Sequence, residues 1–171
     1  MHENAVELDR TVFYPLGGGQ AGDTGRIGAW RVIDTRKNGE AVLHLVEPNS
    51  PIEVGMKLPI EIDWERRHRL MRLHTALHLL GAVVKAPVTG GRIGDDKAHL
   101  DFDIEMEKLV KTMSVAPPRG EGRVRLLEIP GVDLQACGGT HVKNTAEVGS
   151  VALARIRSEG KRNKRVTLVL P

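Results

Sequence analysis

The chain has 171 residues, of which 40% are hydrophobic and only 3% aromatic, so it is long enough for one domain or two small ones with an aliphatic core. This composition excludes a disordered chain, and two Trp, two Phe and one Tyr are too few for a surface that stacks successive nucleic-acid bases. The formal net charge is +3, so a nucleic-acid ligand would be held by charge and shape.

The first 63 residues predict a small β domain, because short alternating runs are separated by turn residues. The sequence Lys37-Asn38-Gly39-Glu40 predicts a tight hairpin turn, since Asn-Gly tolerates positive φ angles. We expect strands over residues 5–8, 11–14, 29–34, 41–46 and 58–62.

The second domain, residues 64–171, is expected to be α+β. Asp63 can cap a helix in which Leu70, Leu73, Leu77 and Leu80 recur at spacings of three and four. A glycine-rich loop should follow this helix and lead into a strand over residues 97–104, after which we expect a second short helix. The remaining runs predict strands of a mixed sheet over residues 123–129, 132–135, 151–156 and 165–170.

Two pairs of residues suggest a metal site. His74 and His78 lie four residues apart on the predicted helix, so their imidazoles share one face, although such a pair among leucines also fits hydrogen-bonded core histidines. Thr75 occupies the position where an HExxH zinc protease needs a glutamate, which argues against proteolysis. The sequence Cys137-Gly138-Gly139-Thr140-His141 holds the only cysteine of the chain and predicts zinc more strongly.

Three motifs together resemble a known family. HTALHLL at 74–80 and CGGTHV at 137–142 look like the zinc motifs of the alanyl-tRNA synthetase editing domain, and FYPLGGGQAGDTG at 13–25 resembles its glycine-rich stretch. No aminoacylation domain is recognisable, so the chain is more similar to the free-standing AlaX editing proteins. The resemblance implies an N-terminal β-barrel-like domain, followed by an α+β editing domain with helices packed on a mixed sheet, of the threonyl/alanyl-tRNA synthetase editing type.

The same resemblance implies the chemistry. AlaX proteins hydrolyse the ester that joins serine, and sometimes glycine, to tRNA(Ala), and one Zn²⁺ per chain would be held by His74, His78, Cys137 and His141. An aminoacyl ester is already activated, so a metal ion and backbone donors suffice without a serine–histidine–acid triad, and we recognise no such triad. Four protein ligands are typical of a closed structural zinc, so either the metal expands its coordination or one ligand moves away when substrate binds.

The glycine-rich stretch contains a G-x-G-x-x-G pattern, at Gly17, Gly19 and Gly22. It does not predict dinucleotide binding, because further glycines follow at 25 and 28 and no βαβ unit surrounds it. The resemblance instead implies that Gln20 and the backbone of Gly17, Gly18 and Gly19 bind the terminal adenosine of the tRNA.

Thr89 is a candidate for recognising the serine hydroxyl, although a simple turn hydroxyl is the alternative. We therefore predict His74, His78, Gln20 and Thr89 as catalytic residues. His44, His68 and His99 lie outside the motifs, and we expect them to be ordinary core or surface residues.

The C-terminal segment 155–165 is strongly basic, with a single acidic residue. It predicts either an anion-binding surface or a solvated strand edge protected by cations. If the former holds, Lys161, Arg162, Lys164 and Arg165 contact tRNA phosphates.

The chain departs from the AlaX family in one respect, because residues 105–118 form only a short bridge where the family has a longer region. The main alternative function is a non-catalytic, zinc-stabilised RNA-binding module, and a small-molecule metallohydrolase is the third. The expected partner is tRNA(Ala) charged with serine or glycine, with no obligate protein partner. No membrane-spanning run or signal peptide is recognisable, so we expect a cytoplasmic protein without membrane contacts.

Overall fold

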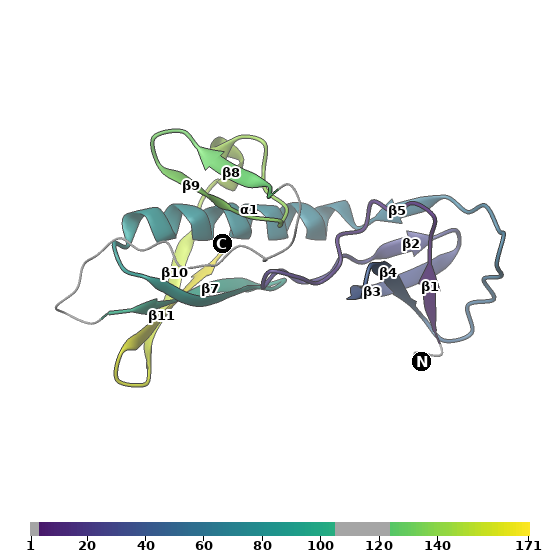
Figure 1. Cartoon of the computed structure of the whole chain (residues 1–171), viewed down its shortest axis with the longest axis horizontal. Coiled ribbons are helices and arrows are strands. Elements are labelled where there is room, and N and C mark those ends of the chain that lie inside the picture. Colours follow the sequence, from purple (N-terminus) through teal and green to yellow (C-terminus); the bar gives the residue numbers. More distant parts are fainter. Residues whose placement is uncertain (1–3, 105–123) are drawn as a thin grey trace. The chain divides into compact units, whose positions relative to one another are not determined.

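The computed structural model describes residues 4–104 and 124–171 (Figure 1). The chain divides into two compact units, Met1–Arg69 and Leu70–Pro171, whereas the sequence suggested a boundary after residue 63. The described residues contain one α-helix, α1 (Trp64–Val83), and three β-sheets, so the fold is α+β. The expected second short helix and the bridge 105–118 lie outside the described residues.

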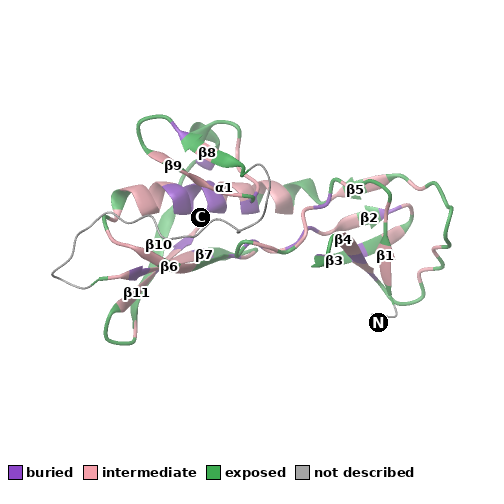
Figure 2. Ribbon diagram, in the orientation of Figure 1, coloured by how far each residue is buried: buried purple, intermediate pink, exposed green. Residues whose placement is uncertain are grey.

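The first unit is built on a five-stranded sheet with the strand order β1-β4-β3-β2-β5. The hairpin predicted at Asn38-Gly39 is confirmed, because Asn38 pairs with Ala41 and Gly39 has a φ angle of +62°. The side chains of Phe13, Ile27, Val32 and Val46 form the buried core of this sheet. Figure 2 marks the buried parts of the ribbon in purple. The strands are β1 (Ala5–Glu7), β2 (Gly25–Ile27), β3 (Trp30–Asn38), β4 (Ala41–Val46) and β5 (Ile60–Ile62).

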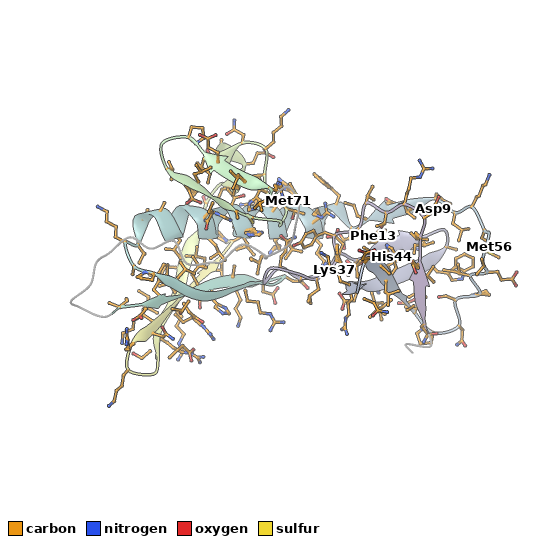
Figure 3. All side chains as sticks on the ribbon, viewed as in Figure 1. Asp9, Phe13, Lys37, His44, Met56 and Met71 are labelled. Atoms are coloured by element: carbon orange, nitrogen blue, oxygen red, sulfur yellow. The ribbon has the colours of Figure 1, made fainter. Side chains whose placement is uncertain are left out.

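His44 belongs to this core, as the sequence suggested. Its ring packs edge-on against Phe13 with 5.1 Å between ring centroids (Figure 3). Its Nε2 lies 2.7 Å from Thr11 Oγ1 and its Nδ1 lies 3.0 Å from the carbonyl oxygen of Val6. Both ring nitrogens are therefore satisfied within the unit.

The predicted strand 11–14 is wrong, because this segment bonds to side chains and to another loop. The Tyr14 N–H donates to Asp23 Oδ2 at 2.6 Å, and the Asp23 N–H donates to the Tyr14 carbonyl at 2.9 Å. The buried Asp23 carboxylate also accepts from Arg67 Nε at 2.9 Å. The glycine-rich stretch is thus anchored through a buried ion pair, and β2, which follows it, was missed by the sequence analysis.

Helix α1 begins as predicted, because the Arg66 N–H donates to the side chain of Asp63 at 3.0 Å. Figure 1 shows the part of α1 in the second unit between a four-stranded sheet and a two-stranded hairpin. The four-stranded sheet has the order β10-β11-β7-β6, with β6 (Val88–Ile93), β7 (Lys97–Asp103), β10 (Ala152–Glu159) and β11 (Asn163–Val169). The hairpin consists of β8 (Leu126–Ile129) and β9 (Asp133–Ala136), and a short 3₁₀-helix spans Thr145–Val148.

Two expectations about this unit need correction. Every described strand pair is antiparallel, so the expected mixed sheet is wrong for this part of the chain; β6 and β7, and β10 and β11, are joined by short turns, which connect antiparallel strands. The expected glycine-rich loop contains strand β6. A Cβ atom on Gly91 would lie 2.8 Å from Leu100 Cδ2, so glycine there permits close packing inside a strand.

Candidate metal centre

Four side chains from two distant segments converge in the second unit. The ligand atoms of His74, His78, Cys137 and His141 all lie within 4.8 Å of one another. Cys137 Sγ is 3.5 Å from His74 Nε2 and 3.2 Å from His141 Nε2. In a tetrahedral zinc site the sulfur-to-nitrogen separation is about 3.6 Å, given the usual bond lengths. The three-nitrogen, one-sulfur donor set therefore fits a single Zn²⁺ ion.

The secondary structure explains why these side chains meet. His74 and His78 are one helical turn apart on α1, both are buried, and their ring centroids are 5.3 Å apart. The loop after β9 supplies Cys137 and His141, and the His141 ring centroid is 4.2 Å from that of His74. The Cys137 N–H donates to the carbonyl of Arg125 at 3.1 Å, which ties the start of this loop to the chain entering β8.

The ring of His78 is oriented by strand β9. Its Nδ1 lies 2.9 Å from Asp133 Oδ2, and the side-chain amide of Gln135 donates to the same carboxylate oxygen at 2.7 Å while contacting the imidazole. With Nδ1 protonated and bonded to Asp133, the Nε2 lone pair is left for the metal cluster. This arrangement is a carboxylate–histidine pair of the kind that supports metal ligands.

Thr75 performs a similar task for His141. Its hydroxyl oxygen lies 3.3 Å from His141 Nδ1 and accepts a hydrogen bond from the Val142 N–H at 3.4 Å. Thr75, which stands where a zinc protease would need a glutamate, therefore positions the candidate ligand His141 from within α1.

The electrostatics favour the ligand form of the histidines. Burial, followed by the repulsion of His141 and His78, lowers the pKa of His74 to about 2, and burial with the neighbouring His78 lowers the pKa of His141 to about 4. Burial raises the pKa of the Cys137 thiol. The imidazoles of His74 and His141 are therefore neutral at neutral pH, and binding of a cation would release the thiol proton.

The other predicted catalytic residues are not part of this cluster. Gln20 belongs to the first unit, is 1% exposed, and is held by reciprocal backbone hydrogen bonds with Gly17 at 3.1 and 2.9 Å. Gly18 and Gly19, at the centre of this turn, have φ angles of +56° and +82°, which favour glycine. Thr89 is exposed on β6, and its hydroxyl oxygen lies 3.3 Å from both Asn163 Oδ1 and the carbonyl oxygen of Asp101, so its single proton is donated to one of these two acceptors.

The predicted basic patch is distributed over more than one surface. Lys161 and Arg162 lie in the turn between β10 and β11, where Arg162 pairs with Asp103 at 3.0 Å. Lys164 and Arg165 are successive residues of β11 and therefore point to opposite faces of the sheet. Arg165 forms a bidentate pair with Asp101, at 2.7 and 2.8 Å.

The residues that orient the ligands were not predicted from the sequence. Asp133 and Gln135 alternate on β9, four and two residues before Cys137, so period-two spacing could have placed them on one face. Thr75 lies between the two helical histidines, but only the tertiary structure shows what its hydroxyl contacts.

Comparison with known proteins identifies similar sequences for most of the chain. Residues 124–167 match the family described as "Threonyl and Alanyl tRNA synthetase second additional domain", and residues 1–66 match "tRNA synthetases class II (A)". No described helix has the length and apolar character that a membrane crossing requires.

Three relatives illustrate the similarity. The alanyl-tRNA editing protein AlaX-M of Saccharolobus solfataricus is 36% identical over 208 aligned positions, covering 95% of this chain and 87% of the relative, and the AlaX-M of Methanosarcina barkeri is 33% identical with 96% and 88% coverage. An alanine–tRNA ligase of Saccharolobus islandicus is 34% identical over 91% of this chain but only 23% of its own length. Because 208 aligned positions exceed the 171 residues present, the AlaX-M protein has residues without a counterpart here.

Proposed function

Because this chain belongs to the AlaX family of alanyl-tRNA editing proteins, we propose that it hydrolyses the ester linking serine, or glycine, to tRNA(Ala) in a zinc-dependent reaction. The enzyme is an aminoacyl-tRNA hydrolase that acts in trans. The convergence of His74, His78, Cys137 and His141 carries this proposal, because these residues form the one candidate metal cluster among the described residues. Because the proposed substrate is an aminoacyl-tRNA, we also propose that the enzyme acts in the cytoplasm.

The four ligands would hold one Zn²⁺, which when bound supplies Lewis-acid chemistry at the ester. Asp133 keeps the Nδ1 proton of His78 in place, and Thr75 holds the ring of His141. Both contacts fix ring orientation before substrate arrives, so the geometry of the site does not have to be assembled during the reaction.

The remaining substrate contacts are also proposed from the sequence. In the first unit, Gln20 and the turn Gly17–Gly19 would bind the terminal adenosine, and the five-stranded sheet would represent the β-barrel-like domain of the family. Thr89 is exposed, and its hydroxyl has two alternative acceptors at 3.3 Å, so it would be able to exchange one of them for the hydroxyl of serine. Lys161, Arg162, Lys164 and Arg165 would contribute phosphate contacts.

Deacylation assays test the function. Purified protein is incubated with Ser-tRNA(Ala), Gly-tRNA(Ala) and Ala-tRNA(Ala), and release of each amino acid is followed together with zinc content. We expect turnover of the first two, and loss of both zinc and turnover in His78→Ala. Deacylation at the uncatalysed rate with stoichiometric zinc would show a non-catalytic RNA-binding module, whereas turnover of simple esters without tRNA would show a small-molecule hydrolase.

A second variant separates metal binding from substrate binding. Gln20→Ala should retain zinc and lose deacylation, with about 1 to 3 kcal/mol less transition-state stabilisation if one buried hydrogen bond is lost. Because Gln20 is buried, thermal unfolding is measured in parallel. Normal turnover by a folded Gln20→Ala variant would assign the glycine-rich turn a purely structural role.

A further inference from the structure

The four-stranded sheet of the second unit has two chemically different faces. On β7, Ala98 and Phe102 are buried, and Leu100 lies close to Gly81 of α1. The alternate residues, Lys97, His99 and Asp101, therefore point away from the helix. We call this side of the sheet the outer face.

The strand register places polar residues of the outer face in rows that cross the sheet. Arg92 of β6 pairs with His99 of β7, His99 pairs with Thr167 of β11, and Thr167 pairs with Arg155 of β10. At the usual strand spacing, this row is about 14 Å wide. An adjacent row contains Asp101, Arg165 and Arg157.

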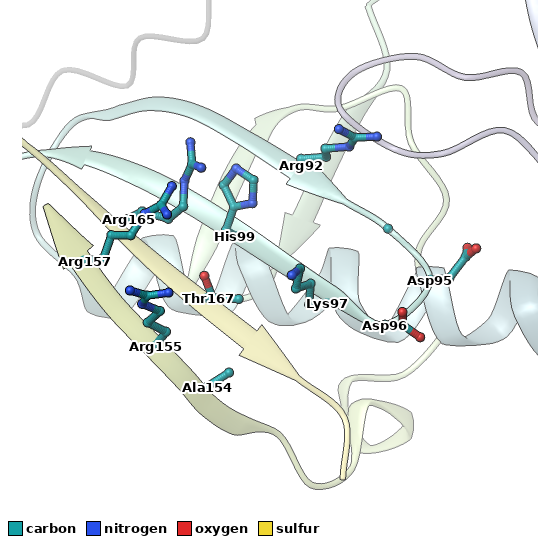
Figure 4. Close-up of a pocket in the computed structure, with 11 residues that line it drawn as sticks. Arg92, Asp95, Asp96, Lys97, His99, Ala154, Arg155, Arg157, Arg165 and Thr167 are labelled. Carbon is teal, nitrogen blue, oxygen red and sulfur yellow. The ribbon is translucent and has the colours of Figure 1, made fainter. Parts of the chain in front are cut away.

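These rows line an open hollow of about 580 Å³ (Figure 4). Figure 4 shows the side chains of Arg92, His99 and Arg165 on one side of the sheet, whereas Asp95 and Asp96 lie at the turn that follows β6. Among the described residues that line the hollow, His99 alone carries an aromatic ring, so the hollow offers little surface for stacking a base.

Several cations of the outer face have no acidic partner among the residues that the structure describes. Arg165 is paired with Asp101, and Arg157 is paired with Glu159. For Arg92, Lys97 and Arg155, the structure records no ion pair within residues 4–104 and 124–171. The arginines stand at the two ends of the first row, with His99 and Thr167 between them as hydrogen-bonding groups.

We propose that the outer face binds the phosphodiester backbone of the tRNA, with Arg92 and Arg155 contacting separate phosphates. The proposal rests on the function inferred above, which supplies a polyanionic substrate, and on charge complementarity. A free nucleotide fits less well, because the hollow is open and the imidazole of His99 is the one ring that the described residues offer to a base. Backbone contacts of this kind position the RNA without reading its sequence.

His99 provides an internal reporter of occupancy. Its pKa is lowered by burial and by the positive charges of Arg165 and Arg92, against which Asp101 and Glu159 act in the opposite direction. A phosphate bound between the arginines would offset their charge and raise this pKa.

The experiment compares two double variants that remove the same charge. Arg92→Ala/Arg155→Ala alters the outer face, and Lys85→Ala/Lys143→Ala removes two exposed cations from other parts of the same unit. Binding of uncharged tRNA is measured by fluorescence anisotropy over a salt series, with thermal unfolding and zinc content as controls for folding. Deacylation of Ser-tRNA(Ala) is measured on the same preparations.

For the outer-face variant we expect a salt-dependence slope that is lower by about 1.4 to 1.8 and an affinity that is weaker by about tenfold or more, since two phosphate contacts are lost. KM should rise more than kcat falls, and the imidazole resonances of His99 should show a higher pKa with RNA only when both arginines are present. The lysine variant should match the wild type in all these measurements.

The two proposals fail in different ways. If the wild type deacylates Ser-tRNA(Ala) but both double variants show its salt slope and affinity, the tRNA lies on another surface and only the outer-face proposal is overturned. If the outer-face variant loses affinity while the wild type does not deacylate, the binding surface stands and the hydrolytic function is overturned. A wild type that does not bind tRNA would overturn both.

Discussion

Asp133 is predicted to control zinc affinity although it is not a ligand. Its Oδ2 lies 2.9 Å from His78 Nδ1, and the carboxylate is itself held by Gln135. In Asp133→Ala the imidazole loses the acceptor that orients it and favours protonation of Nδ1, so the Nε2 lone pair is no longer directed at the cluster.

The expected effect follows from what such supporting groups contribute elsewhere. Removal of one group that supports a metal ligand typically weakens metal binding 10- to 100-fold, which corresponds to about 1.4 to 2.7 kcal/mol of binding free energy. Asp133→Asn retains an acceptor oxygen without the charge and should lose less. Deacylation at limiting zinc should fall in proportion to metal occupancy and recover when zinc is added.

Zinc affinity is measured by competition with a chromophoric chelator at fixed pH. Glu128→Gln, an exposed carboxylate on the neighbouring strand β8, is the matched control and should bind zinc as the wild type does. Equal affinity of Asp133→Ala and the wild type would refute the reasoning. A loss accompanied by a lower unfolding temperature in excess zinc would instead indicate that Asp133 is needed for folding.

Three further predictions concern stability. In the zinc-free protein, the pKa values of His74 and His141 are lowered, so the unfolded chain binds more protons than the folded chain below pH 6.5. The free energy of unfolding should therefore decline from pH 6.5 towards pH 4, by up to about 1.4 kcal/mol per pH unit for each histidine. Denaturant midpoints that do not change between pH 7 and 5 would contradict this. Arg67→Ala leaves the buried Asp23 carboxylate without its partner and should cost about 3 kcal/mol or more in urea unfolding, so a loss below 1 kcal/mol would show that Asp23 is satisfied by backbone donors alone. Gly22→Ala should prevent the first unit from folding correctly, because the new Cβ would lie 2.1 Å from a backbone oxygen, and native-like circular dichroism with an unchanged melting temperature would disprove it.

The sequence by itself determined the features that depend on residues close together in the chain, such as the start of α1 and the Asn38-Gly39 turn. The Asp63 side chain caps α1 and leucine spacing predicts its course, while Asn38-Gly39 encodes a hairpin through its tolerance of positive φ. The two metal motifs were recognisable because each pair of ligands is only four residues apart, on one helix face or within one tight loop. A shared metal site could therefore be predicted from the sequence, and the tertiary structure brings the two pairs of candidate ligands together.

Features that depend on partners distant in the chain required the tertiary structure. Gly90 and Gly91 suggested a loop, but close packing against β7 places them in β6. Asp133 gained its role only when β9 was brought beside α1. The row from Arg92 to Arg155 exists because antiparallel register aligns four strands, and no local pattern encodes that register, since it is set by burial of the opposite apolar face of the sheet.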